Sequence, residues 1–88
     1  LSGIDAFKEE KQGRLVYDNL KYELTNQNLT TAQKLTLGDY IINVITYLIA
    51  GDLRVARLKA NNLNTTALYT AGRKTWLLNR IDTEIALL

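Results

Sequence analysis

The side chains best suited to chemistry lie near the C-terminus, where aromatic rings alternate with guanidinium groups. At the helical spacing of about 100° per residue, a set of them falls within about 80° of one another. The set comprises Tyr69, Arg73, Trp76, Arg80, Thr83 and Leu87. Tyrosine, tryptophan and arginine carry much of the binding energy at protein interfaces. We therefore predict a partner-binding surface on a C-terminal helix, made by Tyr69, Arg73, Trp76, Arg80 and Leu87.

The same face has a second interpretation, in which the first helix of the chain covers it. Trp76 is then a core residue, and Arg73 and Arg80 form the rim around it. The exposure of Trp76 separates the two interpretations, because a docking surface requires its indole ring to reach solvent.

The basic residues suggest an alternative function, which is binding to nucleic acid. Residues 45–88 carry six basic and three acidic side chains, whereas residues 1–44 carry five basic and six acidic ones. Arginine and lysine bind phosphates, and arginine beside aromatic rings is common where bases stack. The candidate nucleic-acid-binding residues are Arg54, Arg57, Lys59, Arg73, Lys74 and Arg80.

A helix-turn-helix can be laid on residues 57–80, with Asn61 and Asn62 at the turn and a recognition helix beginning over residues 65–69. The match is partial, because Asn62 occupies the usual glycine position and Leu58 the position of a small alanine. The formal net charge of +2 is also modest for a nucleic-acid-binding protein. We therefore place nucleic-acid binding second to protein binding.

Few residues could carry out catalysis. The chain has no cysteine and no histidine, which removes common nucleophiles, bases and metal ligands. Ser2 has no histidine to activate it, Glu9 and Glu10 point in different directions on a helix, and there is no glycine-rich loop. Lys74 falls within the apolar face of the last helix, where a buried lysine could act as a nucleophile, but we expect its ammonium group to extend to water. We predict no enzymatic activity, no cofactor and no metal site.

Helices must position these residues. The chain contains no proline, is rich in leucine and lacks long alternating β-branched runs, which favours helices joined by short polar connections. We predict a single all-α domain over residues 1–88, a compact bundle of four short helices, or of five if Gly13 breaks the first. The bundle is expected to surround a central hydrophobic helix over residues 37–50.

The central helix is predicted from the most apolar run in the chain. One side, expected to face the core, holds Ile41, Ile42, Ile45, Leu48 and Ile49. The boundary side holds Tyr40, Asn43 and Tyr47, whose polar tips could also line a small-molecule site. Thr36 is expected to cap the helix at its start, and Gly51 to end it. Thr30 or Thr31 could cap a short helical turn through Leu35 just before it, so the sequence leaves open whether one helix or two forms there. Asp39 and Asp52 bound the run to twelve residues, whereas a membrane span needs about 20.

Three further helices are expected around it. The first begins after Ser2 as its cap and ends before a polar loop at residues 25–28. The third covers residues 53–60 with Asp52 as its cap, and the last runs from about residue 65 to residue 87. The inner face of the last helix is predicted to hold Ala67, Ala71, Leu78, Ile81, Ile85 and Leu88.

These patterns predict a non-catalytic structural or assembly module that docks, through its last helix, on copies of itself or on a larger partner. A helical chain rich in asparagine and threonine also fits a viral or phage virion component. The chain starts at Leu1 and contains no methionine, so we expect either a processed start or a piece of a longer polypeptide.

Overall fold

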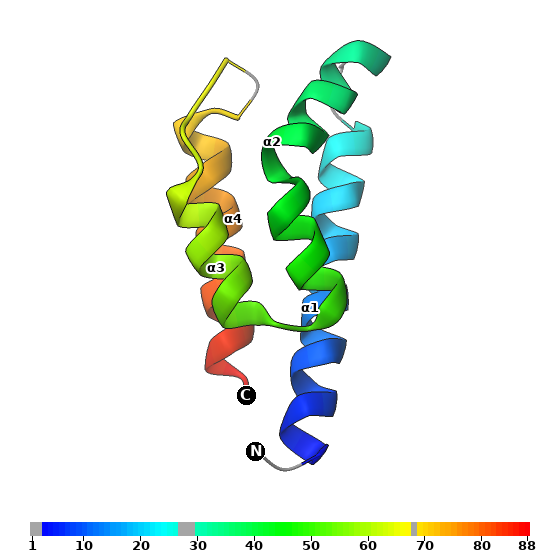
Figure 1. The fold of residues 1–88 in the computed structure, drawn as a ribbon, viewed down its shortest axis with the longest axis vertical. Helices are drawn as coiled ribbons and strands as arrows, with labels where there is room; N and C mark the ends of the chain where they lie inside the picture. Colours follow the sequence, from blue (N-terminus) through cyan, green and yellow to red (C-terminus); the bar gives the residue numbers. More distant parts are fainter. Residues whose placement is uncertain (1–2, 27–29, 68) are drawn as a thin grey trace.

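The regular secondary structure of the described residues is helical. The computed structural model describes residues 3–26, 30–67 and 69–88, and it confirms the predicted all-α bundle. The helices are α1 (Gly3–Asn26), α2 (Thr31–Ala50), α3 (Leu53–Asn62) and α4 (Ala71–Ala86). They form two helical hairpins that lie side by side, α1–α2 and α3–α4, and the N-terminal end of α1 extends past the second hairpin (Figure 1).

The helices occupy the corners of the bundle. Helix α2 packs against α1 and α3, and α4 packs against α3 and α1, so that α2 and α4 lie diagonally opposite. Each helix contributes fully buried side chains to one core, which contains Val16, Leu20, Val44, Leu48, Leu53, Ala56, Ala60, Leu77 and Ile81. Because α2 stands at a corner, only part of its surface faces this core.

Helix α1 is continuous, and Gly13 does not break it. A Cβ atom at Gly13 would overlap the carbonyl oxygen of Leu48 and lie 2.8 Å from Cα of Gly51. Gly51 ends α2 in the left-handed conformation with φ 81°, as predicted, and its own Cα lies against the backbone of Glu10. The two glycines therefore allow α1 and the end of α2 to approach closely. The predicted cap, Ser2, lies outside the described residues.

Helix α2 begins six residues earlier than the predicted central helix. Thr30 is its N-cap: Gln33 N–H donates to Thr30 Oγ1 at 3.1 Å, and Thr30 N–H donates to Gln33 Oε1 at 2.9 Å. This reciprocal capping box stabilises an earlier start, so the helix passes through Thr36 and Gly38 without restarting. Helix α1 extends to Asn26, which shortens the predicted loop, and residues 27–28 lie outside the described residues.

The predicted inner face of α2 is partly wrong. Val44 and Leu48 are fully buried, and Ile45 and Tyr47 pack against the core, whereas Ile42 is 53% exposed and Ile49 is 39% exposed. The prediction placed every isoleucine of the run inside, but a helix at the corner of a bundle buries a narrower stripe. The Ile41 side chain lies outside the described side chains.

The second hairpin confirms one predicted boundary and corrects another. Asp52 caps α3, with Val55 N–H donating to Asp52 Oδ1 at 3.3 Å, and the helix continues to Asn62. Helix α4 begins at Ala71 rather than near residue 65, because Thr70 caps it by accepting the N–H of Arg73. Its inner face is centred on Leu77, Ile81 and Glu84. Leu78, Ile85 and Leu88 pack beside the core, while Ala67 and Ala71 are exposed.

Candidate interaction site

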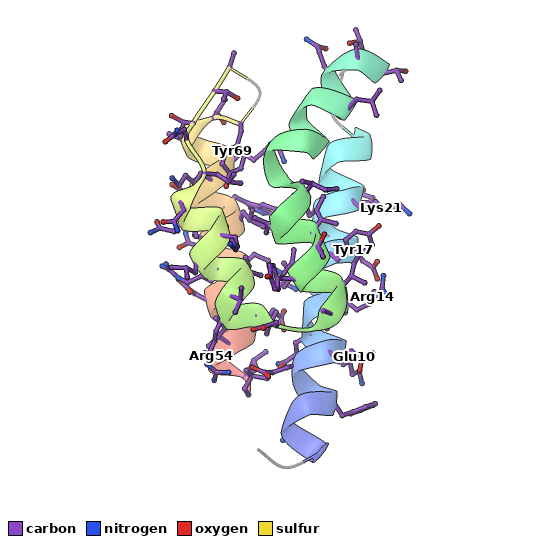
Figure 2. The ribbon with its side chains drawn as sticks, viewed as in Figure 1. Glu10, Arg14, Tyr17, Lys21, Arg54 and Tyr69 are labelled. Atoms are coloured by element: carbon purple, nitrogen blue, oxygen red, sulfur yellow. The ribbon has the colours of Figure 1, made fainter. Side chains whose placement is uncertain are left out.

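Tyr69 does not belong to an exposed surface. It lies in the connection between α3 and α4, not on the last helix, and its side chain is fully buried (Figure 2). The hydroxyl donates to the carbonyl oxygen of Ala60 at 3.4 Å. Burial raises the pKa of Tyr69 to about 12, and the nearby positive charge of Arg73 opposes part of this rise. The connection therefore turns the Tyr69 ring into the core, away from the predicted partner-binding surface.

A local turn explains why the connection is not helical. Tyr69 N–H donates to Thr66 Oγ1, and Thr66 N–H donates to the carbonyl oxygen of Tyr69, both at 2.9 Å. These bonds satisfy backbone groups that a helix starting at residue 65 would need, which leaves Thr70 as the first free cap. Residues 65–67 and 69 therefore do not form the recognition helix of the proposed helix-turn-helix.

The rest of the predicted surface is only partly accessible. Trp76 is half-buried and packs against the core, as in the interpretation that makes it a core residue. Arg80 forms an ion pair with Glu84, an almost fully buried carboxylate, at 2.9 Å between Arg80 Nη2 and Glu84 Oε1. Arg73 is half-buried beside Tyr69. Leu87 remains prominently exposed, at 65%.

The predicted nucleic-acid-binding residues are largely engaged within the molecule. Arg54 forms an ion pair with Glu9 of α1, and Arg57 binds both carboxylate oxygens of Asp82, at 2.7 and 3.3 Å, which raises the pKa of Arg57. Lys74 Nζ donates to the carbonyl oxygen of Leu63 at 2.7 Å. Lys59 is exposed.

The Lys74 ammonium group, which the sequence analysis expected to extend to water, also binds a backbone carbonyl within the molecule. The side chain is half-buried and ties the start of α4 to the connection that precedes it. A lysine held by a backbone carbonyl in this way acts as a structural crosslink.

An apolar surface that the sequence interpretation missed lies on the first hairpin. Among the described side chains, exposed large hydrophobic residues are concentrated on two helices: Phe7, Leu15 and Tyr22 on α1, and Leu35, Ile42 and Ile49 on α2. Leu35, Ile42 and Ile49 are spaced by seven residues, a period that could have been read from the sequence. The sequence prediction assigned these isoleucines to the core because they belong to the most apolar run.

Two adjoining hollows lie along α1. One, of about 420 Å³, is lined by Phe7, Glu10, Lys11, Arg14 and Leu15. The other, of about 300 Å³, lies between α1 and the end of α4 and is lined by Lys8, Lys11, Gln12, Leu15, Glu84 and Leu87. Figure 2 shows Glu10 and Arg14 on the outer side of α1, away from the second hairpin. Both hollows are open and carry no nucleophile paired with a base.

The proposed small-molecule site on α2 gains no support from the one member whose side chain is described. Tyr47 is half-buried and packs against the core, while the Tyr40 and Asn43 side chains lie outside the described side chains. Within the described residues, no group of three or more acidic side chains is arranged to hold a metal ion.

Comparison of the chain with protein-family models, with curated proteins and with solved structures gave no match. Among the described helices, none combines the length and hydropathy needed to cross a membrane. The candidate site therefore stands on the geometry of this chain alone.

Proposed function

We propose that the protein is a non-catalytic assembly module that binds other protein chains through the outer surface of its first hairpin. The observation that carries this proposal is the concentration of exposed large hydrophobic side chains on α1 and α2. Several exposed large apolar side chains on one part of a small folded domain are typical of an interface, because water contact with them is unfavourable until a partner covers them.

The proposal moves the docking surface from the last helix to the first hairpin. Leu87, which belonged to the predicted surface, follows the end of α4 and lines the same hollow as Leu15, so one exposed residue of the predicted surface lies beside the new one. A role as a virion or phage assembly component is one setting for such a module, and it rests on composition.

Site-specific photo-crosslinking tests the proposal. A photoreactive amino acid replaces Leu15, Ile42 or Leu58 in separate variants, which are irradiated in the cells that produce the protein. Leu58 is the matched control, because it is 57% exposed but lies on α3 of the second hairpin, whereas Leu15 is 46% exposed.

We expect protein adducts from positions 15 and 42 and few from position 58, with the crosslinked chains identified by mass spectrometry. Equal adducts at all three positions, or none at the first two, would contradict the proposal. In either case the first hairpin would have no binding preference over the second.

A further inference from the structure

The outer edge of α2 carries a heptad pattern. Its positions are separated alternately by four and three residues, which is the spacing of the seam where two helices pair. They are Thr31, Leu35, Gly38, Ile42, Ile45 and Ile49, and Ile45 lies at the inner border of this set, where it also packs against the core. Leu35 is 67% exposed, and exposed Ile42 and Ile49 follow it at steps of seven residues. We call these six positions the α2 seam.

The seam contains no charged residue. None of its six members is acidic or basic, and the chain carries no charge between Asp39 and Asp52. Two copies of such a surface can meet without like-charge repulsion, whereas a strongly charged partner would find no counter-charge on it. The uncharged seam of one copy is therefore suited to contact the same seam of a second copy.

Gly38 is the second observation that points to a paired helix. It lies inside α2, where glycine is unfavourable compared with alanine. A Cβ atom at Gly38 would meet nothing within 4 Å, so contacts within the chain do not require glycine there. Gly13 and Gly51 differ, because a Cβ atom at either would collide with the backbone of the facing helix. A helix from outside the chain can use the space that Gly38 leaves.

We propose that the occupant is α2 of a second copy, so that the chain forms a dimer through antiparallel pairing of the two α2 seams. This inference rests on the proposed assembly function and names its partner. Pairing Leu35 with Ile49 of the second copy places the two Ile42 side chains together. The same register brings Gly38 beside Ile45 and Thr46 of the second copy, where larger side chains fill its space.

Antiparallel pairing is favoured over parallel pairing for two reasons. In a parallel dimer in register, Gly38 faces Gly38 and leaves a gap at the seam, whereas close packing favours small residues opposite large ones. The dipoles of two antiparallel helices also attract, because each positive N-terminus lies near a negative C-terminus. The pairing is isologous, so it closes as a dimer and does not extend into a filament.

Molar mass measured by light scattering tests the dimer on the purified chain. We expect a mass twice the 10.0 kDa of one chain at high concentration, falling toward one chain mass on dilution. Ile42→Glu is expected to weaken dimerisation at least a hundredfold, while Leu58→Glu, at a similarly exposed site on α3, leaves it within twofold. A wild-type chain that stays monomeric at millimolar concentration overturns the inference, as does equal weakening by both variants.

Gly38→Ala provides a test that does not depend on a charged side chain. Because the added methyl group meets open space and alanine favours a helix, the monomer should unfold at a higher temperature. The same methyl group should weaken the dimer at least tenfold by holding the two helices apart. A variant that raises both monomer stability and dimer affinity would show that Gly38 does not mark the contact.

Cysteine pairing tests the orientation, since the chain has no native cysteine. An antiparallel seam brings Leu35→Cys of one copy to Ile49→Cys of another, so a mixture of the two variants should form a mixed disulfide efficiently. Leu35→Cys alone should form little disulfide. Rapid disulfide formation by Leu35→Cys alone would indicate parallel pairing and overturn the proposed arrangement.

The failures of the two proposals are distinguishable. A monomeric purified chain whose position 42 still crosslinks to another protein in cells rejects self-pairing and retains the assembly function. A chain that forms no adduct in cells and no dimer in solution rejects both.

Discussion

The second hairpin holds most of its described charged side chains in bonds within the molecule, whereas the first carries most of the exposed large hydrophobic side chains among the described residues. Arg57 and Lys74 bind groups within the second hairpin, and the buried Glu84 is paired with Arg80. On α1, Lys8 and Lys11 form no ion pair within the described part of the chain, and on α2 Ile42 is exposed. The hairpins share one core, so the difference lies in their outer surfaces. This difference is the basis of the proposal that the first hairpin supplies the surface for association.

The largest expected effect comes from disrupting the close contact between α1 and the end of α2, which holds the first hairpin together. Gly13→Ala places a methyl group against the carbonyl oxygen of Leu48 and the backbone of Gly51, neither of which can move independently of its helix. We expect the free energy of unfolding to fall by about 3 kcal/mol, the upper part of the usual range for overpacking. Urea unfolding followed by circular dichroism measures the change.

Gly38→Ala is the control for this prediction, because it is the same substitution in a neighbouring helix with no atom in the way. Measured at a concentration where the chain is monomeric, it should increase the free energy of unfolding by about 1 kcal/mol or less. If both variants lost the same free energy of unfolding, the close approach of α1 and α2 at Gly13 would not be the cause of the loss.

The dependence of stability on alkaline pH tests the burial of Tyr69 in the second hairpin. The pKa of Tyr69 is raised from 10.0 to about 12 in the folded protein, chiefly because its ring is buried. Below pH 10 the hydroxyl is protonated in both states, and the full stabilisation is present. Between pH 10 and pH 12 the unfolded chain loses the proton first, so stability falls by about 2 to 3 kcal/mol at 1.36 kcal/mol per pKa unit.

Ultraviolet absorbance of the phenolate, recorded with unfolding curves across this pH range, checks the Tyr69 prediction. Tyr69→Phe should remove the late ionisation and flatten the pH dependence of unfolding over the same range. A late-titrating phenolate that persists in Tyr69→Phe would assign the ionisation to another tyrosine.

The sequence predicted the helices where local signals were strong. Asp52 and Gly51 mark boundaries through side-chain capping and the left-handed conformation, and both were identified from residue type alone. The start of the central helix was placed too late because Thr36 also resembles a cap, and the start of α4 was placed near residue 65, too early. The choice among several threonines depends on which reciprocal bonds form, as in the Thr30 capping box.

The position of Tyr69 was mispredicted for a related reason. Moving the start of α4 from residue 65 to Ala71 takes Tyr69 off the helix, and the turn at Thr66 directs its ring inward. Helical spacing also cannot reveal which of two apolar sides of α2 faces the core. That choice depends on how many helices pack around it, a property of the whole fold.

A third prediction concerns the ion pair that accompanies the buried Glu84. Arg80→Met keeps much of the apolar stem of the side chain but leaves the Glu84 carboxylate without its partner. Because Glu84 is only 3% exposed, we expect the free energy of unfolding to fall by about 2 kcal/mol, less than for a fully buried pair. Chemical unfolding measures this loss. Adding Glu84→Gln to Arg80→Met should restore part of the lost free energy of unfolding, because the unpaired charge is removed. If the double variant is no more stable than Arg80→Met, the loss comes from the packing of Arg80 alone.

The smallest expected effect concerns the ion pair that joins the two hairpins at the bundle surface. Arg54 of α3 binds Glu9 of α1, and the Arg54 side chain is 63% exposed, so water and salt screen the attraction. Arg54→Gln should lower the free energy of unfolding by less than about 1 kcal/mol at low ionic strength, with the difference from wild type shrinking as salt is added. Parallel unfolding titrations at two salt concentrations measure this. A larger, salt-independent loss would mean that the alignment of the two hairpins depends on this ion pair. The shared core, with Leu20, Leu48 and Leu77, would then not determine that alignment alone.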